Sequence, residues 1–428
     1  MKIVLISALV SVSFLFSCES GSKKTADENV QVDYDLSDDL SDDLSDEVLT
    51  ESEVLTEVDE TSDETADIMT EENEDDEEMT DFEEIPDEDN VVWPPVGCLQ
   101  GEYKVFFGNF HSHTGNSDGE GNPEQAFIMA RDEAGLDSLA VTDHLEQLYT
   151  LYGMADDDFP DCIDTAETIS DENFLAICGF EYGSGFKVSV ETGLNISTGH
   201  SNVFFTEKLF PMVQLDFRDY YTTLQNCIEC VAQFNHPGDE ETQTFNEWET
   251  HPEVFSKIAL YEFNGAGDVW NLFFPALSNG WYLSPTYNQD NHSANWGTAN
   301  DNRTGLHLTE LSQEALKDAF LKRRTFATSD KNATIRMMAG DICWMGSQIQ
   351  GVNKIKISVE VSDPDGEGFE KIEIFDPFKN IVNSKNCGTQ PACKLEFDLE
   401  ISMATHIVAK AVQSDGQFLV ASPLWFIP

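Results

Sequence analysis

Histidines and carboxylates occur together in short motifs along the middle of the chain, each next to an apolar run. The side chains concerned are His111, His113, Asp118, His144, Glu181, His200, His236, Asp290 and His292. Imidazole and carboxylate groups bind zinc, manganese and iron without any thiolate. These residue types predict a cluster of two to three divalent metal ions.

The spacing of the first motif places two ligands on one side of the backbone. His111 and His113 are separated by one residue at the end of an expected strand, so their side chains point to the same face. A single such pair is weak evidence, but six of the nine histidines stand at expected strand ends together with the three carboxylates. Three histidines lack that context and are predicted not to be ligands: His251, His307 and His406.

Strands that alternate with helices must position these side chains. Apolar runs predict strands over 103–110, 136–142, 174–181, 231–235, 258–264 and 281–287. Helical patterns cover 123–134 and 314–324. Such alternation argues for a parallel α/β architecture, in which catalytic groups collect at the carboxyl ends of the strands. We expect this domain to span residues 98–330.

After about Thr328 the apolar period becomes two. Ile355, Ile357, Val359 and Val361 alternate with polar residues, and the segment 394–401 repeats the pattern. Several such runs predict a small antiparallel β-sandwich over residues 331–428, as a separate C-terminal module.

The motifs resemble those of the PHP (polymerase and histidinol phosphatase) family over residues 103 to about 330. His-x-His-Thr, Ser-Asp-Gly, Thr-Asp-His, Gly-x-Glu, Asn-His-Pro-Gly and Asp-x-His appear in family order. The resemblance implies a distorted (β/α)7 TIM-like barrel with up to three metals at the carboxyl ends of its strands. It also implies a metal-dependent hydrolase, with phosphoester hydrolysis as the expected reaction.

The same resemblance implies how the ligands are shared among the ions. The first metal would be held by His111, His113, Glu181 and Asp290. The second would be held by Asp118, His144 and His292, and the third by His200, His236 and a shared Glu181. A water bridging the first two metals would become the nucleophile near neutral pH, while the metals polarise the phosphoryl oxygen. The expected substrate is a small, anionic ester.

Two alternative functions remain open. The strand 201–205, the segment 323–328 and the appended β-domain look like the carbaryl-hydrolase branch of the family, which raises carbamate or amide hydrolysis on the same cluster. A different class is a surface-binding lipoprotein whose metals are structural and whose β-sandwich recognises a partner. An intact ligand set argues against this last interpretation, because a pure binding protein needs no open metal cluster.

Two further side chains are candidate catalytic residues. Asp143 precedes a ligand histidine and could orient it through a hydrogen bond, although a cap or turn role fits equally well. Arg303 closely follows the last ligands and could clamp a phosphate. A surface salt bridge is the alternative for Arg303.

The first 18 residues are predicted to be a lipoprotein signal peptide. Lys2 precedes an apolar run from Ile3 to Phe16 that is too short for a comfortable membrane span. The end of this run, Leu15-Phe16-Ser17-Cys18, resembles a bacterial lipobox. That resemblance implies cleavage before Cys18, diacylation of its side chain and anchoring to a bacterial membrane of the cell envelope, either periplasmic or surface-exposed.

Residues 19–97 are predicted to form an acidic, disordered tether that holds the enzyme off the membrane, with a calcium-binding or surface-export role as the alternative. There are 32 acidic residues and two lysines between Glu19 and Asp89, and Asp-Leu-Ser-Asp repeats with a period of four from Asp35 to Asp46. Such sequence cannot bury enough apolar surface to fold. The formal net charge of the whole chain is -58. Nucleic acid is therefore not an expected partner, because phosphate binding depends on lysine and arginine.

Eight cysteines remain apart from Cys18, an even number that suits disulfides in an oxidising compartment. Cys387 and Cys393 flank a turn-rich loop and are expected to staple a hairpin. Cys227 and Cys230 form a Cys-x-x-Cys motif in a helix expected over 220–231. We interpret this pair as structural, with a redox role as the alternative.

Overall fold

The computed structural model describes residues 97–145, 154–155, 157–184, 187–188, 195–196, 199–211, 217–238, 244–264 and 269–427. The chain divides into two units, Met1–Phe82 and Glu83–Pro428, and every described residue belongs to the second. The predicted signal peptide with Cys18, and the predicted tether up to residue 96, lie outside the described residues. Within the described part, no helix combines the length and apolar character that a membrane span requires.

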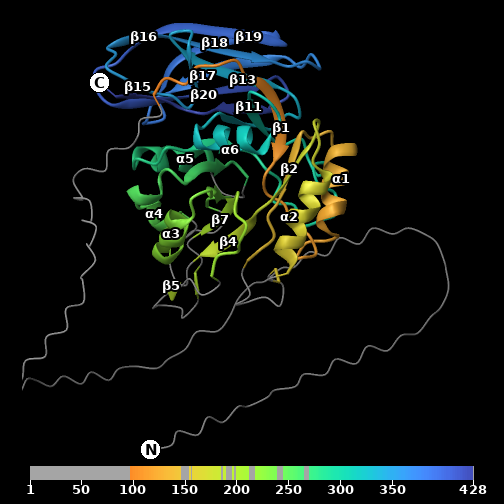
Figure 1. Ribbon diagram of the computed structural model, residues 1–428. Helices are drawn as coiled ribbons and strands as arrows, with labels where there is room; N and C mark the ends of the chain where they lie inside the picture. Colours follow the sequence, from red (N-terminus) through yellow and green to blue (C-terminus); the bar gives the residue numbers. More distant parts are fainter. Residues whose placement is uncertain are drawn as a thin grey trace, which may run out of the picture. The chain divides into compact units, whose positions relative to one another are not determined.

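One sheet carries the first motifs of the sequence. Its strands are β1 (Lys104–Asn109), β2 (Ser138–Val141), β3 (Leu175–Cys178), β11 (Arg303–Leu308) and β12 (Thr325–Thr328). They lie in the order β12-β11-β1-β2-β3, with β1, β2 and β3 parallel and β11 antiparallel to both of its neighbours. The helices α1 (Pro123–Asp132) and α2 (Asp158–Ile169) pack together beside β2 and β3 (Figure 1).

A second sheet carries the later motifs. Its strands are β4 (Phe180–Ser184), β7 (Gly199–Phe204), β8 (Val231–Asn235), β9 (Ile258–Glu262) and β10 (Ser284–Thr286), in the order β10-β9-β8-β7-β4. Strands β8, β9 and β10 are parallel, and β7 is antiparallel to β4 and β8. Short strands β5 (Lys187–Val188) and β6 (Asn195–Ile196) form a separate pair. The remaining helices are α3 (Phe217–Asn226), α4 (Phe245–Trp248), η2 (Pro252–Val254), α5 (Val269–Ser278) and α6 (Gln313–Leu321).

The two sheets meet at Gly179, within the segment 174–181 that the sequence predicts as one strand. A Cβ atom at Gly179 would lie 2.5 Å from the carbonyl oxygen of Val203, so only glycine fits at this close approach. The chain pairs with β2 before Gly179 and with β7 after it. The mixed α/β class is thus confirmed. The described strands form two sheets, each with antiparallel members, and the expected distorted (β/α)7 barrel is not confirmed.

The C-terminal region is rich in antiparallel strands, as predicted. One sheet contains β13 (Thr334–Ala339), β14 (Cys343–Trp344), β16 (Lys354–Ser362) and β19 (Ala392–Glu400). The other strands are β15 (Gln348–Gln350), β17 (Phe369–Phe375), β18 (Ile381–Gln390), β20 (Thr405–Gln413), β21 (Phe418–Ala421) and β22 (Leu424–Ile427).

This C-terminal region shares a sheet and an apolar cluster with the part of the chain before it. Strand β21 pairs with β12, with Phe326 opposite Ala421, so the C-terminal strands extend the first sheet. Phe326 also belongs to the same apolar cluster as Ile357 and Val359, which are fully buried. The period-two alternation therefore identified the strands correctly but gave no sign of this shared sheet and core.

All eight predicted disulfide-forming cysteines are paired. The bonds join Cys98 to Cys343, Cys162 to Cys178, Cys227 to Cys230 and Cys387 to Cys393. The predicted hairpin staple is confirmed, since Cys387 lies on β18 and Cys393 on β19. The predicted helix over 220–231 was too long, because α3 ends at Asn226 and leaves the Cys-x-x-Cys pair in the loop that follows.

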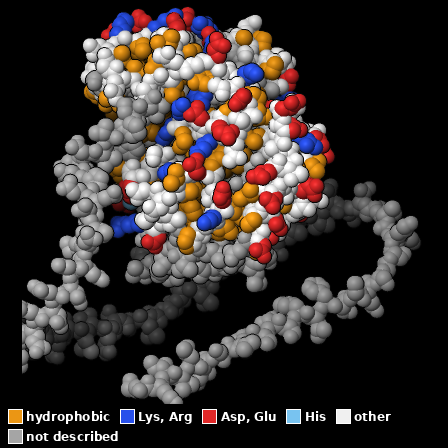
Figure 2. Space-filling view, viewed as in Figure 1, with side chains coloured by type: hydrophobic (Ala, Val, Ile, Leu, Met, Phe, Trp, Pro, Cys, Tyr) orange, Lys and Arg blue, Asp and Glu red, His pale blue; other side chains and the backbone are white. Residues whose placement is uncertain are grey.

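Acidic side chains are prominent on the described surface. In the face drawn in Figure 2, they are scattered over the part of the molecule that holds α1 and α2. Helix α2 begins with Asp158 and Asp161 in its first turn, where negative charge interacts favourably with the helix dipole.

Candidate metal centre

The buried carboxylate of Glu181, on β4, lies at the centre of the histidine cluster. Its Oε2 atom is 3.2 Å from Nε2 of His111 and 3.1 Å from Nδ1 of His144. Its Oε1 atom is 3.2 Å from Nδ1 of His200 and 3.2 Å from Nε2 of His236. One carboxylate therefore contacts imidazoles that are widely separated in the sequence.

The candidate ligands form three overlapping groups whose donor atoms lie within 4.8 Å of one another. The groups are His111, His113, Glu181 and Asp290; His113, Asp118, His144 and His292; and His144, Glu181 and His200. His236 joins the last group through its contact with Glu181. All nine side chains singled out in the sequence are thus brought together. His113 and His144 each belong to two groups, so the ligands are shared more widely than the family resemblance implied.

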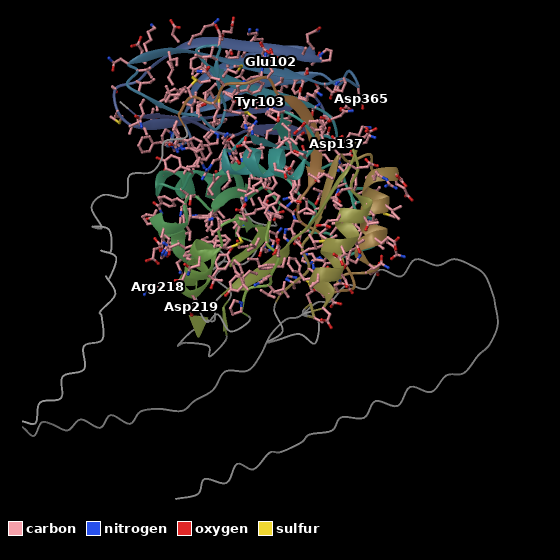
Figure 3. The ribbon with its side chains drawn as sticks, in the orientation of Figure 1. Glu102, Tyr103, Asp137, Arg218, Asp219 and Asp365 are labelled. Carbon is pink, nitrogen blue, oxygen red and sulfur yellow. A yellow bond between two sulfur atoms is a disulfide. The ribbon has the colours of Figure 1, made fainter. Side chains whose placement is uncertain are left out.

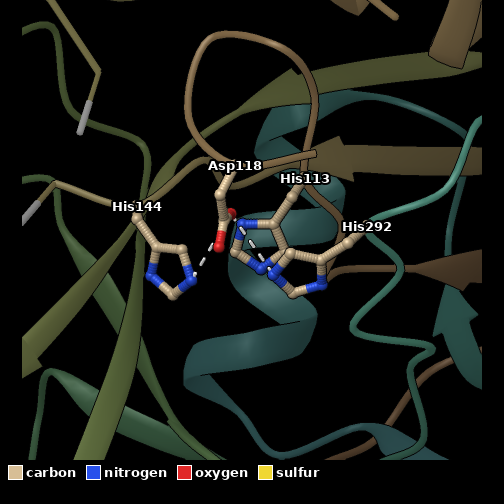
Figure 4. A group of neighbouring side chains, drawn as sticks. All are labelled: His113, Asp118, His144 and His292. Atoms are coloured by element: carbon tan, nitrogen blue, oxygen red, sulfur yellow. Dashed lines mark ion pairs between the residues drawn. The ribbon is translucent and has the colours of Figure 1, made fainter. Parts of the chain in front are cut away.

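The group drawn in Figure 4 faces solvent on one side. His113, Asp118, His144 and His292 converge there, and Nε2 of His292 is 3.4 Å from Oδ1 of Asp118. The side chains of Asp118 and His292 are 38% and 37% exposed, whereas those of His113 and Glu181 are almost completely buried. The cluster is therefore closed at its base and open at this group.

Strand ends and tight backbone contacts fix the candidate ligands in place. His111 follows β1, His144 follows β2, Glu181 and His200 lie on β4 and β7, and His236 follows β8. The amide of Asp290 donates a hydrogen bond of 3.0 Å to the carbonyl of His111. Two ligands adopt left-handed backbone conformations, with φ of +47° at Asp290 and +25° at His236. Such conformations are unfavourable for residues other than glycine and are concentrated at functional sites.

A buried carboxylate that the sequence analysis did not single out supports two of the ligands. Glu262, the last residue of β9, has its Oε2 atom 3.0 Å from Nδ1 of His111. The same oxygen accepts a hydrogen bond of 2.9 Å from the backbone N–H of His236. This arrangement leaves Nε2 of His111 facing the cluster and fixes the ring orientation. In the sequence, the one sign of this role is that Glu262 is an acidic residue at the end of an otherwise apolar strand.

Buried amides hold the two glutamates. Nδ2 of Asn235 donates to Oε1 of Glu181 at 2.7 Å, and Nδ2 of Asn288 donates to Oε1 of Glu262 at 2.9 Å. Because both asparagines and both glutamates are buried, these bonds orient the carboxylates and offset part of the cost of burying their charge.

Burial and pairing between carboxylates and imidazoles set the ionisation states of the cluster. Burial alone would raise the pKa of Glu181 and of Asp290, but His111 and neighbouring histidines hold both pKa values well below their usual range. Burial lowers the pKa of His144 to about 3, so this imidazole is neutral at physiological pH and keeps a lone pair. Burial lowers the pKa of His236, but its contact with Glu181 outweighs this and raises it to about 9, and nearby carboxylates likewise raise the pKa of His111.

The donor atoms also fit divalent ions geometrically. Oε2 of Glu181 lies within 3.4 Å of nitrogens of His111, His113 and His144, yet it accepts no hydrogen bond among the described residues. Nδ1 of His144 likewise has no hydrogen-bond partner there. Converging, unsatisfied oxygen and nitrogen donors are costly in a buried site. Divalent transition metals bind such a donor set.

Asp143 does not orient a ligand imidazole as proposed from the sequence. Its Oδ1 atom accepts bonds of 2.7 Å from the N–H of Thr114 and 2.6 Å from the hydroxyl of Ser117. Its Oδ2 atom accepts a 2.7 Å bond from the hydroxyl of Thr114. Asp143 therefore fixes the loop between His113 and Asp118, and so positions ligands through the backbone.

The guanidinium of Arg303 binds backbone carbonyl oxygens and does not have the phosphate-binding role predicted for it. Its guanidinium donates to the carbonyl oxygens of Asn300, Asn302 and Gly297 at 3.0, 2.8 and 2.9 Å. The residue is only 4% exposed. These bonds fold the segment that follows His292, and they correct both earlier interpretations, the phosphate clamp and the surface salt bridge.

Comparison with known proteins gives distant structural similarity only. No protein-family model matches the sequence, and no curated protein matches it significantly. A two-domain protein from Bacteroides vulgatus that contains a predicted PHP-like metal-dependent phosphoesterase is 15% identical, with a TM-score of 0.44, over 78% of this chain and 99% of its own.

Two other solved structures are more distant. The protein PsfC from Pseudomonas syringae is 15% identical, with a TM-score of 0.35, over 52% of this chain and 90% of its own. A lesion-specific endonuclease from Pyrococcus furiosus is 12% identical, with a TM-score of 0.32, over 51% of this chain and 56% of its own. Since these TM-scores lie below 0.5, the case for function rests on the geometry of the cluster.

Proposed function

We propose that this chain is a metal-dependent hydrolase, and more narrowly a phosphoesterase that acts on a small anionic ester. The observation that carries the proposal is the set of three overlapping donor groups joined through Glu181, His113 and His144. A purely structural site needs only one closed ligand set, whereas a catalytic site keeps part of its metal surface open. The exposed side chains of Asp118 and His292 give the cluster that open side.

The residues of the chain have distinct tasks in this proposal. Divalent ions, when bound, would supply a water of lowered pKa and polarise the phosphoryl oxygen. Glu181 holds the donor groups together from the buried side, and Glu262 fixes the orientation of His111. Asp118 and His292 lie where the cluster opens, so substrate would approach along that side.

Carbamate or amide hydrolysis is a second candidate, favoured by one specific observation. Arg303, the cation that the sequence offered for phosphate binding, is engaged with backbone carbonyls. A neutral ester needs no such cation, and the same cluster could polarise its carbonyl group.

We further propose that the enzyme is anchored to a bacterial membrane of the cell envelope through lipidated Cys18. The support comes from the sequence of the first 18 residues and from the segment 19–89 that follows, which contains 32 acidic residues and only two lysines. A nucleic-acid partner is not part of the proposal, because the net charge of -58 would repel a polyanion.

A substrate panel tests the reaction class. The metal-loaded protein is assayed on p-nitrophenyl phosphate, on bis-p-nitrophenyl phosphate and on a p-nitrophenyl carbamate, with the metal-free protein as control. The proposal predicts metal-dependent turnover of a phosphate ester above that of the carbamate. The reverse order would favour the carbamate alternative. Absence of turnover on all three in a metal-loaded sample would favour a binding protein with structural metals.

A further inference from the structure

A second group of acidic side chains lies in the C-terminal region, apart from the candidate metal centre. Asp330 precedes β13, and Asp363 and Glu367 occupy the loop between β16 and β17. One carboxylate oxygen from each lies within 4.8 Å of the others. Asp330 and Asp363 are 3% and 5% exposed, so two of these three charges are buried.

The two buried carboxylates are held rigidly by backbone amides. Oδ1 of Asp330 accepts hydrogen bonds of 2.7 Å from the N–H groups of Asn332 and Ala333. Oδ1 of Asp363 accepts bonds of 2.7 and 3.1 Å from the N–H groups of Asp365 and Gly366. In both residues the other oxygen, Oδ2, is left to face the centre of the group.

The side chain of Gln413 enters this group from the end of β20. It is fully buried, and its Nε2 atom donates to Oδ2 of Asp363 at 2.8 Å and to Oδ2 of Asp330 at 3.3 Å. Its Oε1 atom is buried and has no hydrogen-bond donor among the described residues. A buried oxygen without a partner costs free energy, and a bound ion is one recognised cause of such a group.

We propose that Asp330, Asp363, Glu367 and Gln413 bind a calcium ion. Nε2 of Gln413, which carries partial positive charge, lies between the two buried carboxylates. Rotating the side-chain amide by half a turn places Oε1 at this position instead of Nε2. A cation at this point would then be met by oxygen from all four side chains. An all-oxygen donor set without imidazole or thiolate suits calcium and not zinc.

The lysine next to Asp330 is paired with an acid outside the group. The lysine of this region, Lys331, lies 3.5 Å from Asp365, whose carboxylate also accepts a bond from Asn332. Asp365 is labelled in Figure 3 and belongs to the same loop, but it is not one of the three grouped acids.

The ion would join three segments that meet near the connection from β12 to the C-terminal strands. Asp330 lies in the connection from β12 to β13, Asp363 and Glu367 lie between β16 and β17, and Gln413 ends β20. Because β12 belongs to the sheet that carries His111, the ion would stabilise the C-terminal strands against that sheet. The site is independent of the reaction proposed above.

Calcium binding to the full-length, zinc-saturated protein tests the proposal. Equilibrium dialysis should find one calcium per chain that is lost in the double variant Asp330→Asn with Asp363→Asn. Asparagine keeps the oxygen that accepts the backbone N–H bonds, so the loops should still fold. Calcium should also raise the Tm of the original protein and not that of the double variant. Glu367→Gln, at an exposed position, should weaken binding at least about 10-fold and gives a test that does not depend on folding of the double variant.

Matched controls separate this site from the other acids and from the histidine cluster. Asp365→Asn removes a charge from the same loop and should leave calcium binding unchanged. His113→Ala alters the histidine cluster and should also leave it unchanged. The proposal is overturned if the original protein binds no calcium at about 10 mM, above the range of weak extracellular sites. It is equally overturned if the double variant and Glu367→Gln both bind calcium as the original protein does.

Discussion

The carboxylate of Glu262 lies 3.0 Å from Nδ1 of His111, while Nε2 of the same ring faces Glu181 and Asp290 at 3.2 Å each. A carboxylate at one imidazole nitrogen makes the other nitrogen a better metal ligand and fixes the direction of its lone pair. Glu262 therefore acts on the cluster through His111, as a positioning residue.

Replacing Glu262 with Gln should weaken metal binding by about 10- to 100-fold, the usual effect of losing such a partner. The measurement is competition with a chromophoric chelator, in parallel with kcat and KM. Glu253→Gln is the control, because Glu253 makes a similar 3.1 Å contact with His251 outside the cluster. Equal metal affinity in both variants would remove Glu262 from the proposed site.

Replacing Arg303 with Ala should reduce stability and leave catalysis intact. The change removes a buried guanidinium and leaves the carbonyls of Asn300, Asn302 and Gly297 without their donors. We expect a loss of about 2 to 4 kcal/mol in the free energy of unfolding. Urea titration measures this loss, and Arg336→Ala, at a side chain that is 41% exposed, should cost less than about 1 kcal/mol. If Arg303→Ala instead raised KM for phosphate esters only and left stability unchanged, Arg303 would have the phosphate-binding role first predicted for it.

Two buried histidines outside the cluster should make the fold acid-sensitive. Burial lowers the pKa of His307 and of His406 to about 4, from the ordinary value of 6.5. Above pH 6.5 both histidines are neutral in the folded and the unfolded chain, so they do not make the free energy of unfolding depend on pH. As the pH falls from 6.5 towards 4 the unfolded chain binds protons that the folded chain does not, so stability is lost, by up to about 3 kcal/mol for each histidine.

Urea unfolding of the metal-loaded protein at pH 7.0 and pH 4.5 measures this loss. The double variant His307→Gln with His406→Gln should lose less stability over the same interval, because it lacks the two titrating groups. If the two proteins lose equal stability between these pH values, the histidines are not the source.

Replacing Cys18 with Ala should release the protein from the membrane into the soluble fraction. The predicted acylation requires the cysteine thiol, and the candidate ligands begin 93 positions further on, at His111. Specific activity should be unchanged. Cell fractionation followed by immunoblotting measures the distribution, and a variant that stays membrane-bound would show that the lipobox prediction is wrong.

The sequence was informative where local chemistry is sufficient. Strand β8 was predicted with its observed bounds, Val231–Asn235, because a mostly apolar run is followed there by Asn235-His236-Pro237. The candidate ligands were recognisable because their side-chain types are unusual next to apolar runs. The Cys387–Cys393 staple followed from a turn between two alternating segments.

Contacts between residues that are distant in sequence could not be predicted from these local patterns. The change of sheet at Gly179 depends on a close approach to Val203 from a strand that is distant in sequence. The pairing of β12 with β21 joins residues about 90 positions apart. Arg303 was misjudged because its partners are backbone carbonyls, which leave no trace in residue type. Glu262 was missed because a single acidic residue at the end of an otherwise apolar strand has no distinctive motif.

Metal content measured together with turnover tests the proposed centre most directly. The chain is stripped of metal and reconstituted with zinc, manganese or iron, and bound ions are counted by plasma mass spectrometry. We predict two to three ions per chain, with ester hydrolysis that rises with occupancy. His113→Ala, which removes a side chain shared by two donor groups, should lose at least about 100-fold in turnover. A chain that stays metal-free, or that hydrolyses the ester equally well without metal, would contradict the proposal.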